Sequence, residues 1–254
     1  MTYTAVVLAG SRPGRDTFAE RYGATTKALI PIAGEPMVTR PVRALLNSKR
    51  IGSVLVLTQV PDIVAPALPQ DERIQVRASS ATIAATMLAL CEDPATQWPL
   101  LVTTADHALL DTDTVDEFCG GAEARDIAVG VVDRSALLRR LPGTKRTWLK
   151  FRGGAYTGAN LFALRSPEAA PVIEFWRTVE QDRKKGWRIV SMLGLPTLLG
   201  VALRLLSLDQ ALGRLGRKFN LNVGAVRLSN PLAGVDVDKP EDHALAEAII
   251  ENRL

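Results

Sequence analysis

Aromatic residues and cysteines are scarce in this chain. Phenylalanine, tryptophan and tyrosine make up 5% of its 254 residues, and it contains 2 cysteines. So few rings provide no stacking platform for nucleic acid, and the formal net charge of +4 is only mildly basic. We therefore expect no nucleic acid partner. Cys91 and Cys119 lie far apart in expected helices, which excludes a disulfide framework and favours a reducing cytoplasm.

Two familiar phosphate-binding strings are also absent. The chain has neither the Walker A string Gly-x4-Gly-Lys-Ser/Thr nor the dinucleotide string Gly-x-Gly-x-x-Gly. Its first residues lack the basic region, apolar core and cleavage site of a signal peptide, so we expect a cytoplasmic protein. A hydrophobic content of 47% with 23% charged residues is ordinary for a folded globular chain.

The first half of the chain alternates between β-rich apolar runs and helical stretches. The expected strands are residues 4–9, 53–59, 74–79, 99–105 and 127–133, and the expected helices are residues 37–49, 81–92 and 112–124. Continuous apolar strands separated by helices are typical of a parallel sheet covered on both faces. Right-handed crossovers then place the strand-to-helix loops at the carboxyl edge of the sheet, where ligands bind.

The second half is less regular. Residues 147–151, 159–164 and 226–230 are expected strands. A helix capped by Ser166 follows the second of these. The final helix is expected to begin with a capping box formed by Asp238 and Glu241, with Pro240 in its first turn.

One segment, residues 189–208, is almost entirely apolar. Its length alone permits a membrane span, but Pro196, two glycines and Arg204 interrupt it. We favour a buried or dimer-interface pair of helices over a surface that docks on a membrane or holds a lipid-like acceptor. A true span is the least favoured interpretation.

The loop after the first expected strand combines glycine with positive charge. Gly10 and Gly14 let the backbone approach a ligand, and amides in such a turn form an anion-binding nest. Arg12, Arg15 and Lys27 add charge suited to phosphate. The turn alone also fits a plain tight turn, so its meaning depends on the residues that follow.

The string LAGSRPGR…TKALIPIAGEPM resembles the signature of the MobA-like nucleotidyltransferases, which include cytidylyltransferases of molybdopterin and of methylerythritol phosphate. The matching elements are Leu8-Ala9-Gly10, Gly14-Arg15, Lys27 and Gly34-Glu35-Pro36-Met37. The turn is one residue longer than is usual in the family, and the spacer before the lysine is long. Either Arg12 or Arg15 corresponds to the arginine of the family motif, and we favour Arg15 because it directly follows the second glycine.

Three further sequence motifs resemble those of the family and occur in the same order along the chain. SSATIAATMLAL carries the hydroxyl expected beside the base, for which we favour Thr82 and then Ser80. LLVTTADHALLD carries Asp106 where the family has a metal-binding aspartate, although Ala108 replaces the usual proline. AGVDVDKPEDHALAEAII resembles the closing motif, with Asp236 in the extended approach to the helix.

The resemblance implies a single Rossmann-like α/β domain of the nucleotide-diphospho-sugar-transferase type. Three layers would surround a mostly parallel central sheet. The NTP-transferase domain would span residues 1–254, with an apolar helical insertion at about residues 186–222. The implied reaction transfers a nucleoside monophosphate from an NTP to a sugar, polyol or alcohol phosphate and releases pyrophosphate. CTP is the expected donor, with GTP and UTP left open.

The resemblance also assigns roles to residues. Lys27 and Arg15 would steady the charge of the reacting phosphates, and Asp106 and Asp236 would hold Mg²⁺. Asp238 is left as a helix cap, and His107 needs no part because an acceptor phosphate is already an anion. Nucleotide binding is expected at Leu8, Ala9, Gly10, Ser11, Arg12, Gly14, Ser80, Thr82 and Ala105.

The acceptor side is less clear. KFRGGAYTGANLFAL is similar to the acceptor-binding turn of sugar-phosphate nucleotidyltransferases, with Lys150, Thr157, Gly158 and Asn160 as its expected contacts. A simple hairpin is the competing interpretation. The neighbouring basic residues, which are further candidates for the acceptor phosphate, are Lys145, Arg146 and Arg152.

Two other classes of function remain open. A glycosyltransferase of the related fold would also bind a nucleotide and a metal, but it has less use for Lys27 beside the phosphate loop. The other alternative is a regulatory protein that kept the fold and lost its activity. Release of pyrophosphate, as opposed to a nucleoside diphosphate, distinguishes the first alternative from the proposed enzyme.

Overall fold

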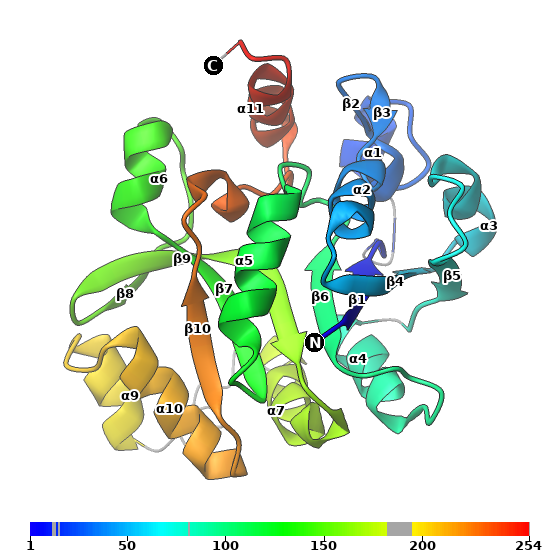
Figure 1. Ribbon diagram of the computed structural model, residues 1–254. Helices are drawn as coiled ribbons and strands as arrows, with labels where there is room; N and C mark the ends of the chain where they lie inside the picture. Colours follow the sequence, from blue (N-terminus) through cyan, green and yellow to red (C-terminus); the bar gives the residue numbers. More distant parts are fainter. Residues whose placement is uncertain (12–13, 15, 81, 182–194, 254) are drawn as a thin grey trace.

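An eight-stranded sheet forms the centre of the computed structural model, which describes residues 1–11, 14, 16–80, 82–181 and 195–253 (Figure 1). The strand order is β10-β7-β9-β6-β1-β4-β5, and β8 pairs with β9 outside this path. The strands are β1 (Tyr3–Leu8), β4 (Ile51–Thr58), β5 (Ile74–Ala78), β6 (Leu100–Thr104), β7 (Ile127–Asp133), β8 (Leu149–Phe151), β9 (Gly154–Leu164) and β10 (Val223–Arg227). All eight expected strands are present.

Most neighbouring strands of the sheet run parallel. β1 pairs in parallel with β4 and β6, β4 pairs in parallel with β5, and β10 pairs in parallel with β7. The exception is β9, which lies antiparallel between β6 and β7. The strands on both sides of β9 therefore point the same way, and their carboxyl ends meet at one edge of the sheet.

Helices cover both faces of the sheet, which gives the expected three layers. α2 (Thr39–Asn47) and α5 (Thr112–Ala122) pack on one face, and α4 (Ile83–Glu92), α7 (Ala170–Gln181) and α10 (Leu208–Phe219) pack on the other. The alternation of side chains along β1 shows this division. Val7 lies in the core that contains Phe118 of α5, whereas Val6 lies in the core that contains Met87 of α4.

Shorter elements complete the fold, and several of them were not expected from the sequence. They are α1 (Thr17–Arg21), η1 (Lys27–Leu29), β2 (Pro31–Ile32), β3 (Glu35–Pro36), α3 (Pro61–Val64), η2 (Ala65–Ala67), α6 (Arg134–Arg140), η3 (Pro167–Ala169), α9 (Leu195–Ala202), η4 (Pro231–Gly234) and α11 (Pro240–Ile250). α1 and the β2–β3 hairpin together fill the long stretch between the glycine loop and α2.

Two predicted helix caps are wrong. α11 begins at Pro240 with Lys239 as its N-cap residue and with no side-chain capping bond, so Asp238 does not cap it. Ser166 precedes the 3₁₀ turn η3, and its side chain makes no capping bond there either. At α11 the N-cap residue is Lys239, whose side chain has no oxygen to accept an amide, and Asp238 lies one residue too early to cap the helix.

The apolar segment 189–208 does not form one long helix in its described part. Residues 189–194 lie outside the described residues, α9 ends at Ala202, and α10 begins at Leu208. Within the described ranges, no helix is both long and apolar enough to cross a bilayer. The expectation of a buried pair is only partly right, since Leu206 and Leu208 are buried whereas Leu203 and Leu205 are 65% and 60% exposed.

Two adjacent glycines near the end of α5 test how tightly this helix packs on the sheet. A Cβ atom on Gly121 would lie 2.6 Å from Cγ1 of Val226 in β10, whereas one on Gly120 would meet nothing within 4 Å. We predict that Gly121→Ala lowers the free energy of unfolding by about 1–3 kcal/mol. Gly120→Ala should leave it unchanged or raise it by up to about 1 kcal/mol. Urea denaturation of both variants checks this, and equal effects would contradict the packing.

Candidate active site

A cavity of about 780 Å³ opens at the carboxyl ends of β1, β4, β5 and β6. Its volume is typical of a small-molecule site. Most of the residues expected to bind nucleotide line it, namely Leu8, Ala9, Gly10, Ser11, Ser80, Thr82 and Ala105. Lys27 and Asp106 line it as well. Arg12 and Arg15, which were expected to hold phosphate, lie outside the described residues.

The start of the glycine loop is held by side chains from other segments. Ser11 donates its backbone N–H to Oε1 of Gln59 at 2.9 Å, and its hydroxyl lies 2.9 Å from that of Thr26. A Cβ atom on Gly10 would lie 2.7 Å from Nε2 of Gln59, so a larger residue would displace the end of this side chain, which bonds Ser11. Gly14 has a φ of 111°, which also favours glycine, but it does not line the cavity.

A short helix follows the loop and forms part of the cavity wall. Asp16 caps α1 by accepting the backbone N–H groups of Phe18 at 3.1 Å and Ala19 at 3.0 Å. Asp16, Thr17 and Phe18 line the cavity, and none of them was expected from the sequence. An aspartate before helix-forming residues is an N-cap signal, and it could have revealed α1.

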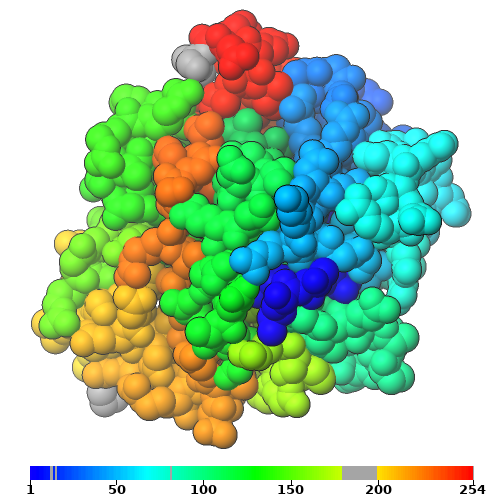
Figure 2. All heavy atoms as spheres, viewed as in Figure 1, coloured from blue at the N-terminus to red at the C-terminus, as the bar shows by residue number. Residues whose placement is uncertain are grey.

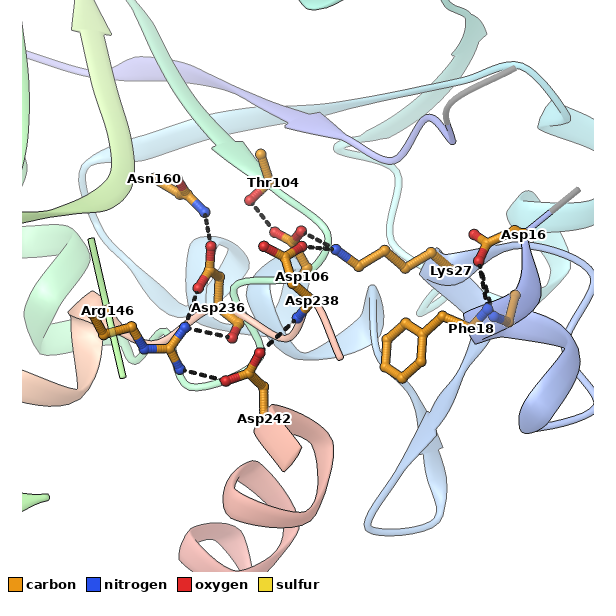
Figure 3. Close-up of polar contacts among 11 residues, drawn as sticks. Asp16, Phe18, Lys27, Thr104, Asp106, Arg146, Asn160, Asp236, Asp238 and Asp242 are labelled. Atoms are coloured by element: carbon orange, nitrogen blue, oxygen red, sulfur yellow. Dashed lines mark hydrogen bonds and ion pairs between the residues drawn. The ribbon is translucent and has the colours of Figure 1, made fainter. Parts of the chain in front are cut away.

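Lys27 lies between two carboxylates. Its Nζ is 2.5 Å from Oδ2 of Asp106 and 2.5 Å from Oδ1 of Asp238, and its side chain is only 22% exposed (Figure 3). Thr104 donates its hydroxyl to the other oxygen of Asp106 at 2.5 Å. Burial disfavours the ammonium, but the two carboxylates outweigh it and raise the pKa of Lys27. The lysine is therefore charged at neutral pH.

Asp238 is thus a correction to the sequence analysis, which left it as a helix cap. Val235 and Val237 are fully buried, so the alternating aspartates of this extended segment face the sheet edge. The backbone N–H of Val237 donates to the carbonyl oxygen of Asp106 at 3.0 Å, which fixes the segment beside β6. Asp238 lines the cavity, whereas Asp236 does not.

Asp236 instead faces a buried arginine. Its Oδ1 accepts from Arg146 at 2.6 Å, and its Oδ2 accepts from Nδ2 of Asn160 at 3.4 Å (Figure 3). Arg146 is 8% exposed and also pairs with Asp242 of α11 at 2.9 Å. Burial raises the pKa of Asp236, with further contributions from Asp238 and Asp106, and Arg146 opposes this shift. Both oxygens of Asp236 are already bonded to protein donors.

The residues expected to bind the acceptor do not gather at one turn. The chain reverses at Gly153 between β8 and β9, so this stretch forms a hairpin, and acceptor binding by its residues stays a prediction. Thr157 and Gly158 pair with β7 inside the ladder, and Lys150 is exposed on β8. Asn160 has a φ of 47° where the β7–β9 register shifts, and it alone of the four contacts the aspartates.

Two hydroxyls and one imidazole near the site have structural contacts. Thr82 caps α4 by accepting the N–H of Ala85 at 3.1 Å, while Ser80 lines the cavity beside it. His107 is buried, its Nδ1 lies 3.3 Å from the hydroxyl of Thr103, and burial lowers its pKa to about 4. Its imidazole is therefore neutral near pH 7 and faces the core.

Comparisons with known proteins agree with this geometry. The family model of the MobA-like NTP transferase domain matches residues 5–216. A solved structure from Thermus thermophilus, described as a hypothetical transferase, is 30% identical, with a TM-score of 0.80 and coverage of 96% of this chain and 100% of that chain. A search of curated proteins finds no match.

Two more distant structures share the fold. One is 4-diphosphocytidyl-2C-methyl-D-erythritol synthase from Anaerococcus prevotii, at 10% identity and a TM-score of 0.59, covering 98% of this chain and 96% of that chain. The other is a CMP:2-keto-3-deoxy-manno-octonic acid synthetase complexed with CTP, at 14% identity and a TM-score of 0.61, covering 100% of both chains. Because the family model spans most of the sequence and a relative matches nearly all of it, the chain belongs to the MobA-like NTP transferase family and is a nucleotidyltransferase.

Proposed function

We propose that this protein uses Mg²⁺ to transfer a nucleoside monophosphate from an NTP to a phosphorylated small molecule, with release of pyrophosphate. The observation that carries the proposal is the half-buried Lys27 ammonium, which lies between Asp106 and Asp238 at the wall of the cavity. Gly10 and Ser11 of the glycine loop line the same cavity. Positive charge and backbone amides thus face the same cavity.

The main obstacle in such a reaction is the repulsion between two anionic substrates. Catalysis then consists mostly of positioning and charge neutralisation. The backbone amides of the loop that starts at Gly10 would bind the triphosphate, that of Ser11 after release from Gln59, and Lys27 would neutralise the α-phosphate. Arg15 and Arg12, which follow Ser11 in the sequence, would bind the outer phosphates as forked donors.

The carboxylates at this edge fit a magnesium ion. Asp106 and Asp238 each place an oxygen 2.5 Å from a single ammonium, so they already converge on one cation. Within the described ranges, no group of three or more acidic, histidine or cysteine side chains forms a metal site. Mg²⁺ needs only one or two carboxylates when phosphate oxygens complete its shell, and it would neutralise charge on the triphosphate.

The roles of the two later aspartates differ in this proposal. Asp238 is 62% exposed, and among the described residues Lys27 bonds only its Oδ1, so it is the better second ligand beside Asp106. Asp236, which the sequence analysis favoured, would first have to release a hydrogen bond from Arg146 or Asn160. We assign Asp236 to the outer part of the site, next to the acceptor.

The reaction itself needs no protein base. An oxygen of the acceptor phosphate attacks the α-phosphorus, the bond from that phosphorus to the bridging oxygen breaks, and pyrophosphate leaves. Of the four residues expected to contact the acceptor, Asn160 is the one whose position supports this role, because it borders Asp236. CTP remains our proposed donor, since the more distant fold relatives include a synthetase complexed with CTP.

A pyrophosphate-release screen tests the proposed reaction. The purified chain is incubated with Mg²⁺ and ATP, CTP, GTP or UTP against a panel of sugar, polyol and alcohol phosphates. We predict pyrophosphate release with CTP that depends on both the metal and the acceptor. Preference for GTP or UTP would correct the donor alone. In a parallel incubation with nucleotide sugars, release of a nucleoside diphosphate would indicate a glycosyltransferase. No turnover in either incubation would favour a regulatory protein.

Replacement of the lysine tests its part in charge neutralisation. We predict that Lys27→Ala lowers kcat for pyrophosphate release about 100- to 1000-fold, as expected when one donor to a developing charge is removed. The matched control is Lys49→Ala, an exposed lysine between α2 and β4 at the amino edge of the sheet. Thermal unfolding of both variants shows whether the fold is retained. Equal activities of the two variants would contradict the assignment.

Charge-removing variants distinguish the three aspartates. We predict that Asp106→Asn and Asp238→Asn raise the Mg²⁺ concentration needed for half-maximal rate by at least about tenfold. Asp236→Asn should change this concentration less than either of them. Glu72→Gln, an exposed residue before β5, is the control and should leave it unchanged. If Asp236→Asn had the largest effect, Asp236 would replace Asp238 as the second ligand.

A further inference from the structure

Exposed leucines gather where α9 ends. Among residues whose side chains the structure describes, eight large apolar residues are exposed, and three of them lie between residues 199 and 205. Leu199, Leu203 and Leu205 are 48%, 65% and 60% exposed. Leu203 directly follows α9, and its N–H donates to the carbonyl oxygen of Leu199 at 2.8 Å, one helical turn earlier. We call residues 199–206 the leucine turn.

The backbone of this turn directs the leucines outward. Arg204 has a φ of 55°, a left-handed conformation that ends α9 and that arginine rarely adopts. The N–H groups of Leu205 and Leu206 then bond back to the carbonyl oxygen of Gly200, at 2.7 and 3.1 Å. The side chain of Leu206 packs against Gly200 and is buried, so Leu203 and Leu205 are exposed on either side of Arg204.

The β8–β9 hairpin lies beside the leucine turn and extends its surface. The N–H of Arg152 donates to the carbonyl oxygen of Leu206 at 2.8 Å. Leu149 of the hairpin is 51% exposed, and it shares a face of β8 with Phe151, which packs near Leu208 of α10. Figure 1 shows β8 and α9 next to each other at the lower left. The hairpin therefore adds a fourth exposed leucine.

The charge of this region has a single sign. Arg204, Lys150 and Arg152 are exposed, and neither residues 199–206 nor residues 149–154 include an aspartate or glutamate. The next acidic residue along the chain, Asp209, is paired with Arg227 at 2.6 Å. Leucines beside exposed cations match a surface that has an apolar interior and negatively charged head groups.

We propose that the leucine turn and the β8–β9 hairpin dock on an anionic lipid surface. Leu203 and Leu205 enter the head-group boundary, and Arg204, with its neighbours, contacts lipid phosphates. A second copy of this chain is a poorer occupant. A two-fold contact through this turn would bring the same cations of both copies together, which opposes association. This proposal is independent of the reaction proposed above.

Vesicle flotation tests the proposal on the full chain. The protein is mixed with phosphatidylcholine vesicles that contain or lack phosphatidylglycerol. We predict flotation with the phosphatidylglycerol vesicles alone, and loss of flotation at high salt. The double variant Leu203→Ser, Leu205→Ser should lower the bound fraction at least about tenfold, because two leucines no longer enter the boundary. Arg204→Gly suits the left-handed turn and should lower it about fivefold.

An exposed apolar residue elsewhere provides the control. Ile63 is 46% exposed on α3, and Figure 2 shows that segment at the right side of the molecule, away from the gold segment near residue 200 at the lower left. Ile63→Ser should float like the unaltered protein. Three results would overturn the proposal: no flotation with any vesicle, equal flotation with neutral vesicles, or a dimer that only the double serine variant separates.

Discussion

A single ammonium group between two carboxylates links three distant segments at the edge of the sheet. Lys27 follows the glycine loop, Asp106 follows β6, and Asp238 precedes α11. Two carboxylates this close would repel each other without the lysine. Asp106 is only 18% exposed, so water solvates its carboxylate poorly. Removal of the Lys27 ammonium would therefore leave this carboxylate without a counter-charge, which is destabilising.

Helix α11 contacts the elements on both sides of Lys27. Nε2 of His243 lies 2.7 Å from the carbonyl oxygen of Pro31, and its ring stacks on Tyr22 at 4.2 Å. Glu247 accepts the N–H of Ala33 at 3.1 Å. The helix thus holds both α1 and the β2–β3 hairpin, the two elements between which Lys27 lies. Positioning of the lysine depends on residues more than two hundred positions later in the chain.

The sequence predicts the sheet better than it predicts the site. The expected strands are right because continuous apolar runs such as Val6 and Val7 have no other place than the centre of a covered sheet. Nothing in the sequence of β9 itself predicts that it runs antiparallel. Its direction depends on its position between β6 and β7, which are distant in the sequence. Asp236 and Asp238 are two residues apart in an extended segment, so the sequence pattern places both side chains on the same side of it. Only the positions of Arg146 and Lys27 separate their roles.

The pairing of Arg146 with Asp236 and Asp242 has a consequence for the order in which the chain folds. Arg146 precedes its two partners by 90 and 96 positions. Because a guanidinium is costly to bury without a counter-charge, Arg146 enters the interior only together with these carboxylates. The central strands can therefore pair first, and the sheet edge closes when the segment of Asp236 and Asp242 docks beside Arg146.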